Sequence, residues 1–263
     1  MESTKNPKSY SVPAVQRSLD LIEALARNHH DLTITEAHRK FKIPKSSVYA
    51  ILQTLKARGY VEQDQDDRYF LTLKLFSLGS ALVDSLDLRK EVSPLLKELT
   101  EKAAITGHVA VRDGGHAVYI EKAEVLGAIR LTTQVGKRMP LHSTSIGKAL
   151  IAHLPEEELD RIISKHGLTR FTHRTITGAR ELKKELAHVR AVGYAVSNEE
   201  NEDGVRAVAA PIFDHDGRVA AAVNLGGSAL QIKPGDFPSL GKLVRATALR
   251  MSRALGHRGE ETK

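Results

Sequence analysis

The chain has 263 residues, 41% of them hydrophobic, and 39 basic against 32 acidic residues give it a net charge of +7. It contains no cysteine, which excludes disulfides, thiolate metal sites and a cysteine nucleophile. The length suits two domains of ordinary size, and the basic balance favours an anionic partner such as nucleic acid without requiring one. Residues 1–10 are polar and predict a disordered tail. Without a signal peptide or an apolar run of membrane length, we expect a cytoplasmic protein with no membrane partner.

The first structured region predicts three short helices. Apolar residues recur at helical spacing from Pro13 to about residue 28, and Thr33 with Glu36 forms a capping box that starts a second helix. After only three residues a third helix begins at Pro44 and ends before Gly59. Two short helices joined by so tight a turn predict a helix-turn-helix, whose second helix enters the major groove of DNA.

The charge around the third helix is of one sign. Between Glu36 and Glu62 there is no acidic residue, while six residues are basic: Arg39, Lys40, Lys42, Lys45, Lys56 and Arg58. A solvated helical face normally mixes both signs, so this stretch indicates a polyanionic partner. An ordinary basic surface is the alternative that charge alone leaves open.

A hairpin follows this helix. Residues 60–63 and 68–73 read as two strands around a polar turn, which makes the helix-turn-helix a winged one spanning residues 11–74. The turn carries Asp64, Asp66 and Asp67, which phosphate repels, so we expect any contact of the wing with DNA to come from Arg68.

Residues 75–103 have the periodicity of a helix that links two domains. Pro94 is expected to interrupt or restart this helix. Its apolar face must be buried either on its own domain or against a second copy, and we favour dimerisation because helix-turn-helix proteins usually read paired half-sites.

The remaining residues, 104–258, alternate strands and helices. Strands are expected at 108–112, 116–120, 129–133, 194–197, 205–213 and 219–225, and helices at 143–153, 155–165, 179–191 and 239–255. This order predicts an antiparallel sheet covered by helices, an α+β domain of the kind found in sensors.

The chain resembles the isocitrate lyase regulator (IclR) family of bacterial transcription factors from about Val12 to Gly256. The matching stretches are residues 11–19, 43–48, 58–61, 135–142, 147–150 and 193–196. The most specific stretch is residues 193–214, which fits the family pattern at Gly193, Ser197, Glu200, Ala207, Val208, Ala209, Ile212, Phe213 and Asp214.

This resemblance implies a winged helix-turn-helix, a linker helix and a GAF-like α/β effector-binding domain, assembled as a homodimer or homotetramer without a cofactor. A small organic molecule would bind the effector domain and change operator binding. The pocket residues that the resemblance implies are Leu131, Met139, Ser145, Ile146, Ser197, Val205, Ala207, Asn224 and Gly226. Residues 145–147 start a helix, where free amides favour an anion. Some relatives carry an acidic residue where this chain has Ser197, so their ligand does not transfer.

We expect polar side chains of the third helix to contact base edges or nearby phosphates of the DNA. Basic residues are expected to neutralise phosphates. Many relatives have arginine after the histidine or tyrosine that corresponds to Tyr49, where this chain has Ala50, so the operator sequence is not inherited either. The candidate DNA-binding residues are Arg17, Thr33, Lys45, Ser46, Ser47, Tyr49, Ala50, Thr54, Lys56, Arg58 and Arg68.

An enzyme and a sensor that no longer binds DNA are the two alternative functions. An enzyme is disfavoured because Glu199 and Glu200, as strand neighbours, point to opposite faces, and because His29, His30, His142 and His153 lack a metal-ligand spacing. A sensor that no longer binds DNA is disfavoured by the intact basic helix. Repression and activation are not distinguished by the sequence, and the effector is expected to be a small carboxylic or sugar acid.

Overall fold

The computed structural model describes residues 11–27, 31–78, 88–124 and 133–257, and the chain divides into two compact units, residues 1–82 and 83–263. Each unit is described by itself. The expected tail at residues 1–10, the central part of the linker at 79–87, and Leu131 lie outside the described residues. No helix within the described ranges is long and apolar enough to cross a membrane.

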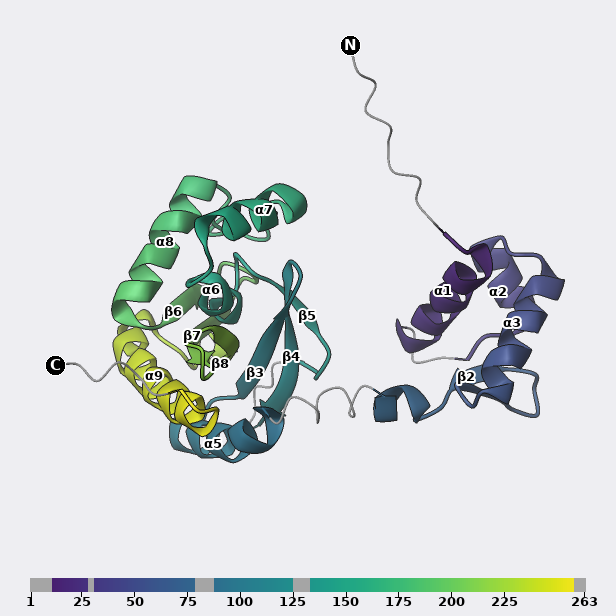
Figure 1. Ribbon diagram of the computed structural model, residues 1–263, viewed down its shortest axis with the longest axis horizontal. Helices are drawn as coiled ribbons and strands as arrows, with labels where there is room; N and C mark the ends of the chain where they lie inside the picture. Colours follow the sequence, from purple (N-terminus) through teal and green to yellow (C-terminus); the bar gives the residue numbers. More distant parts are fainter. Residues whose placement is uncertain (1–10, 28–30, 79–87, 125–132, 258–263) are drawn as a thin grey trace, which may run out of the picture. The chain divides into compact units, whose positions relative to one another are not determined.

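The first unit is a winged helix-turn-helix, as predicted (Figure 1). Its elements are α1 (Pro13–Arg27), α2 (Ile34–Phe41), α3 (Lys45–Ala57), β1 (Val61–Gln63) and β2 (Tyr69–Leu71). The two strands pair antiparallel, and Leu32 forms an isolated bridge with Tyr69. The capping box of Thr33 and Glu36 is present at the start of α2. Val48, Leu52 and Leu55 of α3 are buried in the core of this unit, which leaves the opposite face of α3 uncovered.

The described part of the predicted linker differs from expectation. Residues 74–78 are helical, and α5 (Leu88–Ala103) runs through Pro94 without interruption. The predicted break at Pro94 is therefore wrong. Proline has no amide hydrogen, so Pro94 removes one backbone hydrogen bond from the helix. The burial of Leu88, Val92, Leu96 and Leu99 in a core cluster of the second unit outweighs this loss. These apolar residues of α5 are buried on its own domain, and dimerisation of the chain stays a prediction.

The second unit is built on a six-stranded antiparallel sheet, as the sequence predicted. The strand order is β5-β4-β3-β8-β7-β6. The strands are β3 (Gly107–Asp113), β4 (His116–Ala123), β5 (Arg138–Pro140), β6 (Ala195–Asn198), β7 (Val205–Phe213) and β8 (Val219–Ser228). The expected strand at residues 129–133 falls almost entirely outside the described residues, and β5, which pairs with β4 at the edge of the sheet, was not expected.

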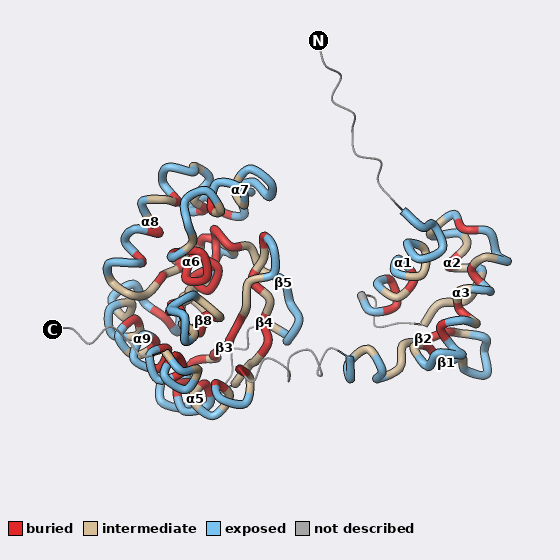
Figure 2. Tube along the Cα trace, in the orientation of Figure 1, coloured by how far each residue is buried: buried red, intermediate tan, exposed pale blue. Residues whose placement is uncertain are grey.

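Helices cover both faces of this sheet (Figure 1). One layer contains α5 and α9 (Phe237–Ala254), and the other contains α6 (Ser145–Ile151), α7 (Glu156–His166) and α8 (Ala179–Val192). Neighbouring residues alternate between the layers, so that Ala209 faces α6 and Ala210 faces α9. Figure 2 shows the buried positions concentrated in α6 and the strands beneath it. Gly147 lets α6 lie close to the backbone of Leu141, because a Cβ at position 147 would be only 2.5 Å from that backbone.

Candidate functional site

The face of α3 that the core leaves uncovered carries most of the predicted DNA-binding residues. Its exposed residues are Lys45, Ser46, Tyr49, Ala50, Thr54 and Lys56, with Arg58 just beyond the helix, and Ser47 is half-buried. Tyr49 is 54% exposed although it is a large aromatic residue. Two of these side chains already have partners: the Thr54 hydroxyl donates to the Ala50 carbonyl at 2.8 Å, and the Lys56 ammonium donates to Gln63 Oε1 at 2.9 Å. Arg17 lies half-buried on α1.

Arg68 and Thr33 are engaged within their own unit. The Arg68 guanidinium donates from Nε to Asp31 Oδ2 at 2.6 Å and from Nη2 to Glu36 Oε2 at 3.3 Å. The Thr33 amide donates to the same Glu36 carboxylate at 2.9 Å, and this backbone bond is the main cause that lowers the Glu36 pKa. These contacts tie β2 to the start of α2. They differ from our expectation of Arg68 as a free phosphate contact.

A cavity of about 310 Å³ opens in the second unit between the sheet and the start of α6. The structure brings seven of the nine predicted effector residues to its wall, and these are Met139, Ser145, Ser197, Val205, Ala207, Asn224 and Gly226. Ile146 does not line the cavity. It points into the core beneath α6 and is fully buried there, because successive residues of a helix face different sides.

The strand register explains why these distant residues meet. Ser197 of β6 pairs with Ala207 of β7, which pairs with Gly226 of β8. Two positions along β8, Asn224 pairs with His108 of β3. Residues two apart on a strand share a face, so both rows line the same side of the sheet.

His108 forms a polar wall with Asn224 and was missed by the sequence analysis. Asn224 Oδ1 accepts from the His108 amide at 3.1 Å and from the His108 ring Nδ1 at 3.0 Å, which leaves Nε2 to accept from the Thr133 hydroxyl at 2.6 Å. The ring stacks on Tyr119 with centroids 4.5 Å apart. Burial lowers the pKa of His108 to about 4, so the imidazole is neutral at pH 7. Burial likewise raises the pKa of the Tyr119 hydroxyl to about 12.

Three hydroxyl groups also line the cavity, from Ser197 of β6 and from Thr144 and Ser145 at the start of α6. The Ser197 hydroxyl donates to the Ser143 carbonyl at 2.8 Å, and the Thr144 hydroxyl caps α6 by accepting from the Gly147 amide at 3.0 Å. The Ser145 hydroxyl is buried and has no hydrogen-bond partner among the residues that the structure describes. An unsatisfied buried hydroxyl costs about 1–3 kcal/mol, so the site favours a ligand atom that completes this bond.

The charged lining of the cavity was also missed. Lys137 and Glu202 are exposed at the cavity, whereas the Arg206 guanidinium donates to Asn198, Glu199 and two backbone carbonyls. The other lining residues absent from our prediction are His108, Tyr119, Thr133, Thr144 and Asn201. A signal existed for part of this set: His108 and Asn224 each stand between apolar or glycine neighbours in a predicted strand, where a buried polar group requires a partner.

The carboxylates considered for enzyme chemistry have separate partners. Glu199 pairs with Arg206 at 2.6 Å, while both oxygens of Glu200 accept from the Lys148 ammonium at 2.9 Å. The hydrogen bond from the Gly204 amide is the largest cause that lowers the Glu199 pKa, whereas burial raises the pKa of Glu200. The two carboxylates therefore contact different cations. The expected reason was wrong, because β6 ends at Asn198 and neither glutamate lies in a strand.

The histidines considered for metal binding have structural contacts. His142 Nε2 donates to the Thr169 carbonyl at 2.9 Å, and His153 packs edge-on against Phe213. His29 and His30 lie outside the described residues. Within the described ranges no group of three or more histidine or acidic side chains is arranged to hold a metal ion.

A winged helix-turn-helix with a basic exposed helix, joined in one chain to an α/β unit with a polar cavity, defines a DNA-binding regulator with a ligand-binding domain. The comparisons with known proteins identify the family. The family model "IclR helix-turn-helix domain" matches residues 14–65, and "Bacterial transcriptional regulator IclR C-terminal" matches residues 80–253. The chain belongs to the IclR family. It is an IclR-type transcriptional regulator with a helix-turn-helix DNA-binding domain and a C-terminal effector-binding domain.

Individual relatives agree over nearly the whole chain. The transcriptional regulator XynR of Escherichia coli is 34% identical over 94% of this chain and 98% of its own length. The crystal structure of the Thermotoga maritima IclR has a TM-score of 0.81 at 31% identity and covers 93% of this chain and 99% of that one. An IclR homolog of Microbacterium hydrocarbonoxydans complexed with 4-hydroxybenzoate shares the fold, with a TM-score of 0.80 at 22% identity over 92% of this chain and 98% of that one.

Proposed function

We propose that this regulator reads a double-stranded DNA operator with the exposed face of α3. The observation that carries the proposal is the basic, uncovered face opposite Val48, Leu52 and Leu55. In this arrangement the base contacts come from Ser46, Ser47, Tyr49, Ala50 and Thr54, and the phosphate contacts from Arg17, Lys45, Lys56 and Arg58. Arg68 and Thr33 are left out because both are occupied within the unit. They stabilise the wing and the start of α2 instead.

The cavity of the second unit is the proposed effector site. Its volume of about 310 Å³ lies at the lower end of the range for small-molecule pockets, roughly 300–1,000 Å³. Lys137 supplies a positive charge for a carboxylate, while Ser145, Ser197 and the neutral His108–Asn224 wall supply hydrogen-bonding groups without further charge. This combination favours a small carboxylic or sugar acid. His108 and Tyr119 are neutral at pH 7 and Arg206 is paired with Glu199, so Lys137 and Glu202 carry the exposed charges among the described lining residues.

Control of operator binding requires that the effector bind two arrangements of the protein with unequal affinity. In a homodimer or homotetramer, two copies of α3 would read two half-sites. The effector then acts by changing the population of the arrangement whose spacing fits the operator.

The experiment is a gel shift with the DNA upstream of the protein's own gene and its neighbours, across a salt series, with D-gluconate, pyruvate or 4-hydroxybenzoate added. We expect specific binding that weakens steeply with salt and that one of these acids shifts. A folded, oligomeric protein that binds none of these fragments would contradict the proposal and favour a sensor without DNA function. Specific binding that no acid changes would contradict only the effector class.

A further inference from the structure

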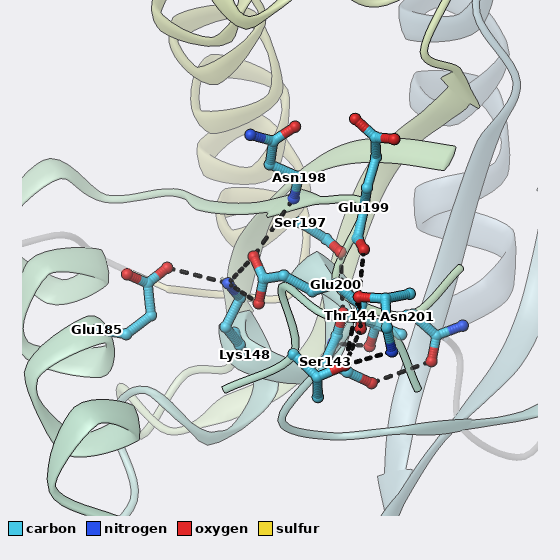
Figure 3. A network of polar contacts seen from close by, with 12 residues as sticks. Ser143, Thr144, Lys148, Glu185, Ser197, Asn198, Glu199, Glu200 and Asn201 are labelled. Carbon is cyan, nitrogen blue, oxygen red and sulfur yellow. Dashed lines mark hydrogen bonds and ion pairs between the residues drawn. The ribbon is translucent and has the colours of Figure 1, made fainter. Parts of the chain in front are cut away.

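The second unit contains a fully buried lysine outside the proposed ligand contacts. Lys148 of α6 donates from Nζ to both oxygens of Glu200 at 2.9 Å and to Glu185 Oε1 of α8 at 3.0 Å (Figure 3). Taking a charged pair out of water has a large desolvation cost, and well-packed apolar residues in its place are often as stable or more stable. Stability alone is therefore a weak reason for a lysine at this position.

The segment that Lys148 holds borders the cavity. We call residues 199–204, which follow β6, the rim segment. Its second residue is Glu200, and the next two residues, Asn201 and Glu202, both line the cavity. Glu199 has a φ of 62°, a left-handed conformation that a non-glycine residue adopts only when its surroundings enforce it.

Further bonds hold the rim segment from neighbouring elements, as Figure 3 shows for several of them. The Thr172 hydroxyl donates to the Glu199 carbonyl at 2.7 Å, and the Thr175 hydroxyl donates to the Glu200 carbonyl at 2.6 Å. The Ser143 hydroxyl donates to Asn201 Oδ1 at 3.0 Å, so the amide group of Asn201 is left to donate. Of the ion pairs that the described residues make with this segment, Lys148–Glu200 is more deeply buried than Arg206–Glu199.

We propose that Lys148 is a positioning residue of the effector pocket: its ion pair with Glu200 fixes the rim segment so that the Asn201 amide and the Glu202 carboxylate contact the effector. The argument rests on the proposed role of the cavity as the effector site. A charge-assisted bond between a fixed helix and a loop restricts both direction and distance, which an apolar contact between the same residues does not. Glu185 contributes by fixing the same ammonium from α8.

The test uses the full chain with Lys148→Met combined with Glu200→Met, which removes both buried charges and keeps an apolar pair of similar size. The matched control is Lys183→Met, because Lys183 also pairs with two carboxylates, Glu156 and Asp160, but has no contact with the rim segment. Hydrogen exchange is measured for the amides of the rim segment and of α8, and D-gluconate affinity is measured by calorimetry beside operator affinity without effector.

We expect the double variant to speed exchange in the rim segment at least tenfold, with α8 unchanged, and to weaken D-gluconate binding at least tenfold with operator affinity unchanged. Unchanged exchange in the rim segment of the folded double variant would overturn the proposal. So would faster exchange throughout the unit, because that is the result of a structural role only. If D-gluconate does not bind the native protein, the effector class fails, and the exchange measurement still decides the role of Lys148.

Discussion

The two proposed binding surfaces use polar side chains in opposite ways. On α3 the candidate contacts are exposed, and several of them have only helix or neighbouring side-chain bonds. Around the cavity, several polar groups are buried and held by specific partners, as in the His108–Asn224–Thr133 wall. DNA presents a long regular array of phosphates, which mobile surface cations can reach. A small ligand offers few contacts, so its partners must be fixed before it binds.

The same contrast separates two cations that both pair with two carboxylates. The Arg68 side chain is 34% exposed and joins Asp31 and Glu36 at the surface, where ion pairs contribute about 0–1 kcal/mol. Lys148 joins Glu185 and Glu200 in the interior, where removing one partner leaves an uncompensated charge. Substitutions at these two cations are therefore expected to differ widely in their effect.

The largest expected effect comes from Lys148→Met alone. It leaves Glu200 buried without its cation, and breaking a buried pair in this way costs about 3–5 kcal/mol of the free energy of unfolding. Urea denaturation measures the loss. The double variant Lys148→Met with Glu200→Met should recover most of it, because the buried Glu200 charge is gone and the remaining carboxylate partner, Glu185, is 27% exposed. Equal losses in the single and double variants would show that packing of the lysine stem, and not its charge, is what matters.

The next effect is a pH dependence that originates at His108. Its pKa is lowered from the usual 6.5 to about 4 by burial, so the unfolded chain binds a proton between these values while the folded protein does not. The contribution is thus present above pH 6.5 and lost as pH falls toward 4, by about 3 kcal/mol in total. Denaturation from pH 7 to 4.5 should show a shallower loss for His108→Gln than for the native protein. Parallel curves would place the titration elsewhere.

A smaller effect is expected for Lys45→Ala on DNA binding. Loss of one phosphate contact should reduce the slope of log affinity against log salt by about 0.9 and weaken binding about tenfold at low salt. Fluorescence anisotropy with an operator fragment across a salt series measures both. Lys165→Ala is the control, since Lys165 is equally exposed but lies on α7. Identical slopes for the two variants would mean that α3 is not the reading helix.

The smallest effect is expected for Arg68→Gln. Its ion pairs are partly exposed, so the free energy of unfolding should fall by less than about 1 kcal/mol. The salt dependence of operator binding should stay unchanged, because the guanidinium already has two carboxylate partners. A reduced salt slope in the same anisotropy assay would restore Arg68 as a phosphate contact and remove the distinction from Lys45.

The sequence by itself determined the elements whose signals are short-range. The Thr33–Glu36 capping box, the boundaries of α3 between Pro44 and Gly59, and five of the six strands in the sheet of the second unit follow from spacing within a few residues. The short strand β5 was not predicted. The family pattern placed seven of the nine pocket residues on the cavity wall. These features were accessible because each depends on neighbours in the chain or on residue types at fixed intervals.

The tertiary structure decided which side chains became partners across the chain. Pro94 lies inside α5 because that helix buries its apolar face in the core, and Ile146 enters the core because it lies on a different side of α6 from Ser145. His108 meets Asn224 only through the register of β3 and β8. Lys148 likewise reaches Glu200 from 52 residues away. Local spacing carries no information about such contacts, because they are set by how strands align and how helices pack over them.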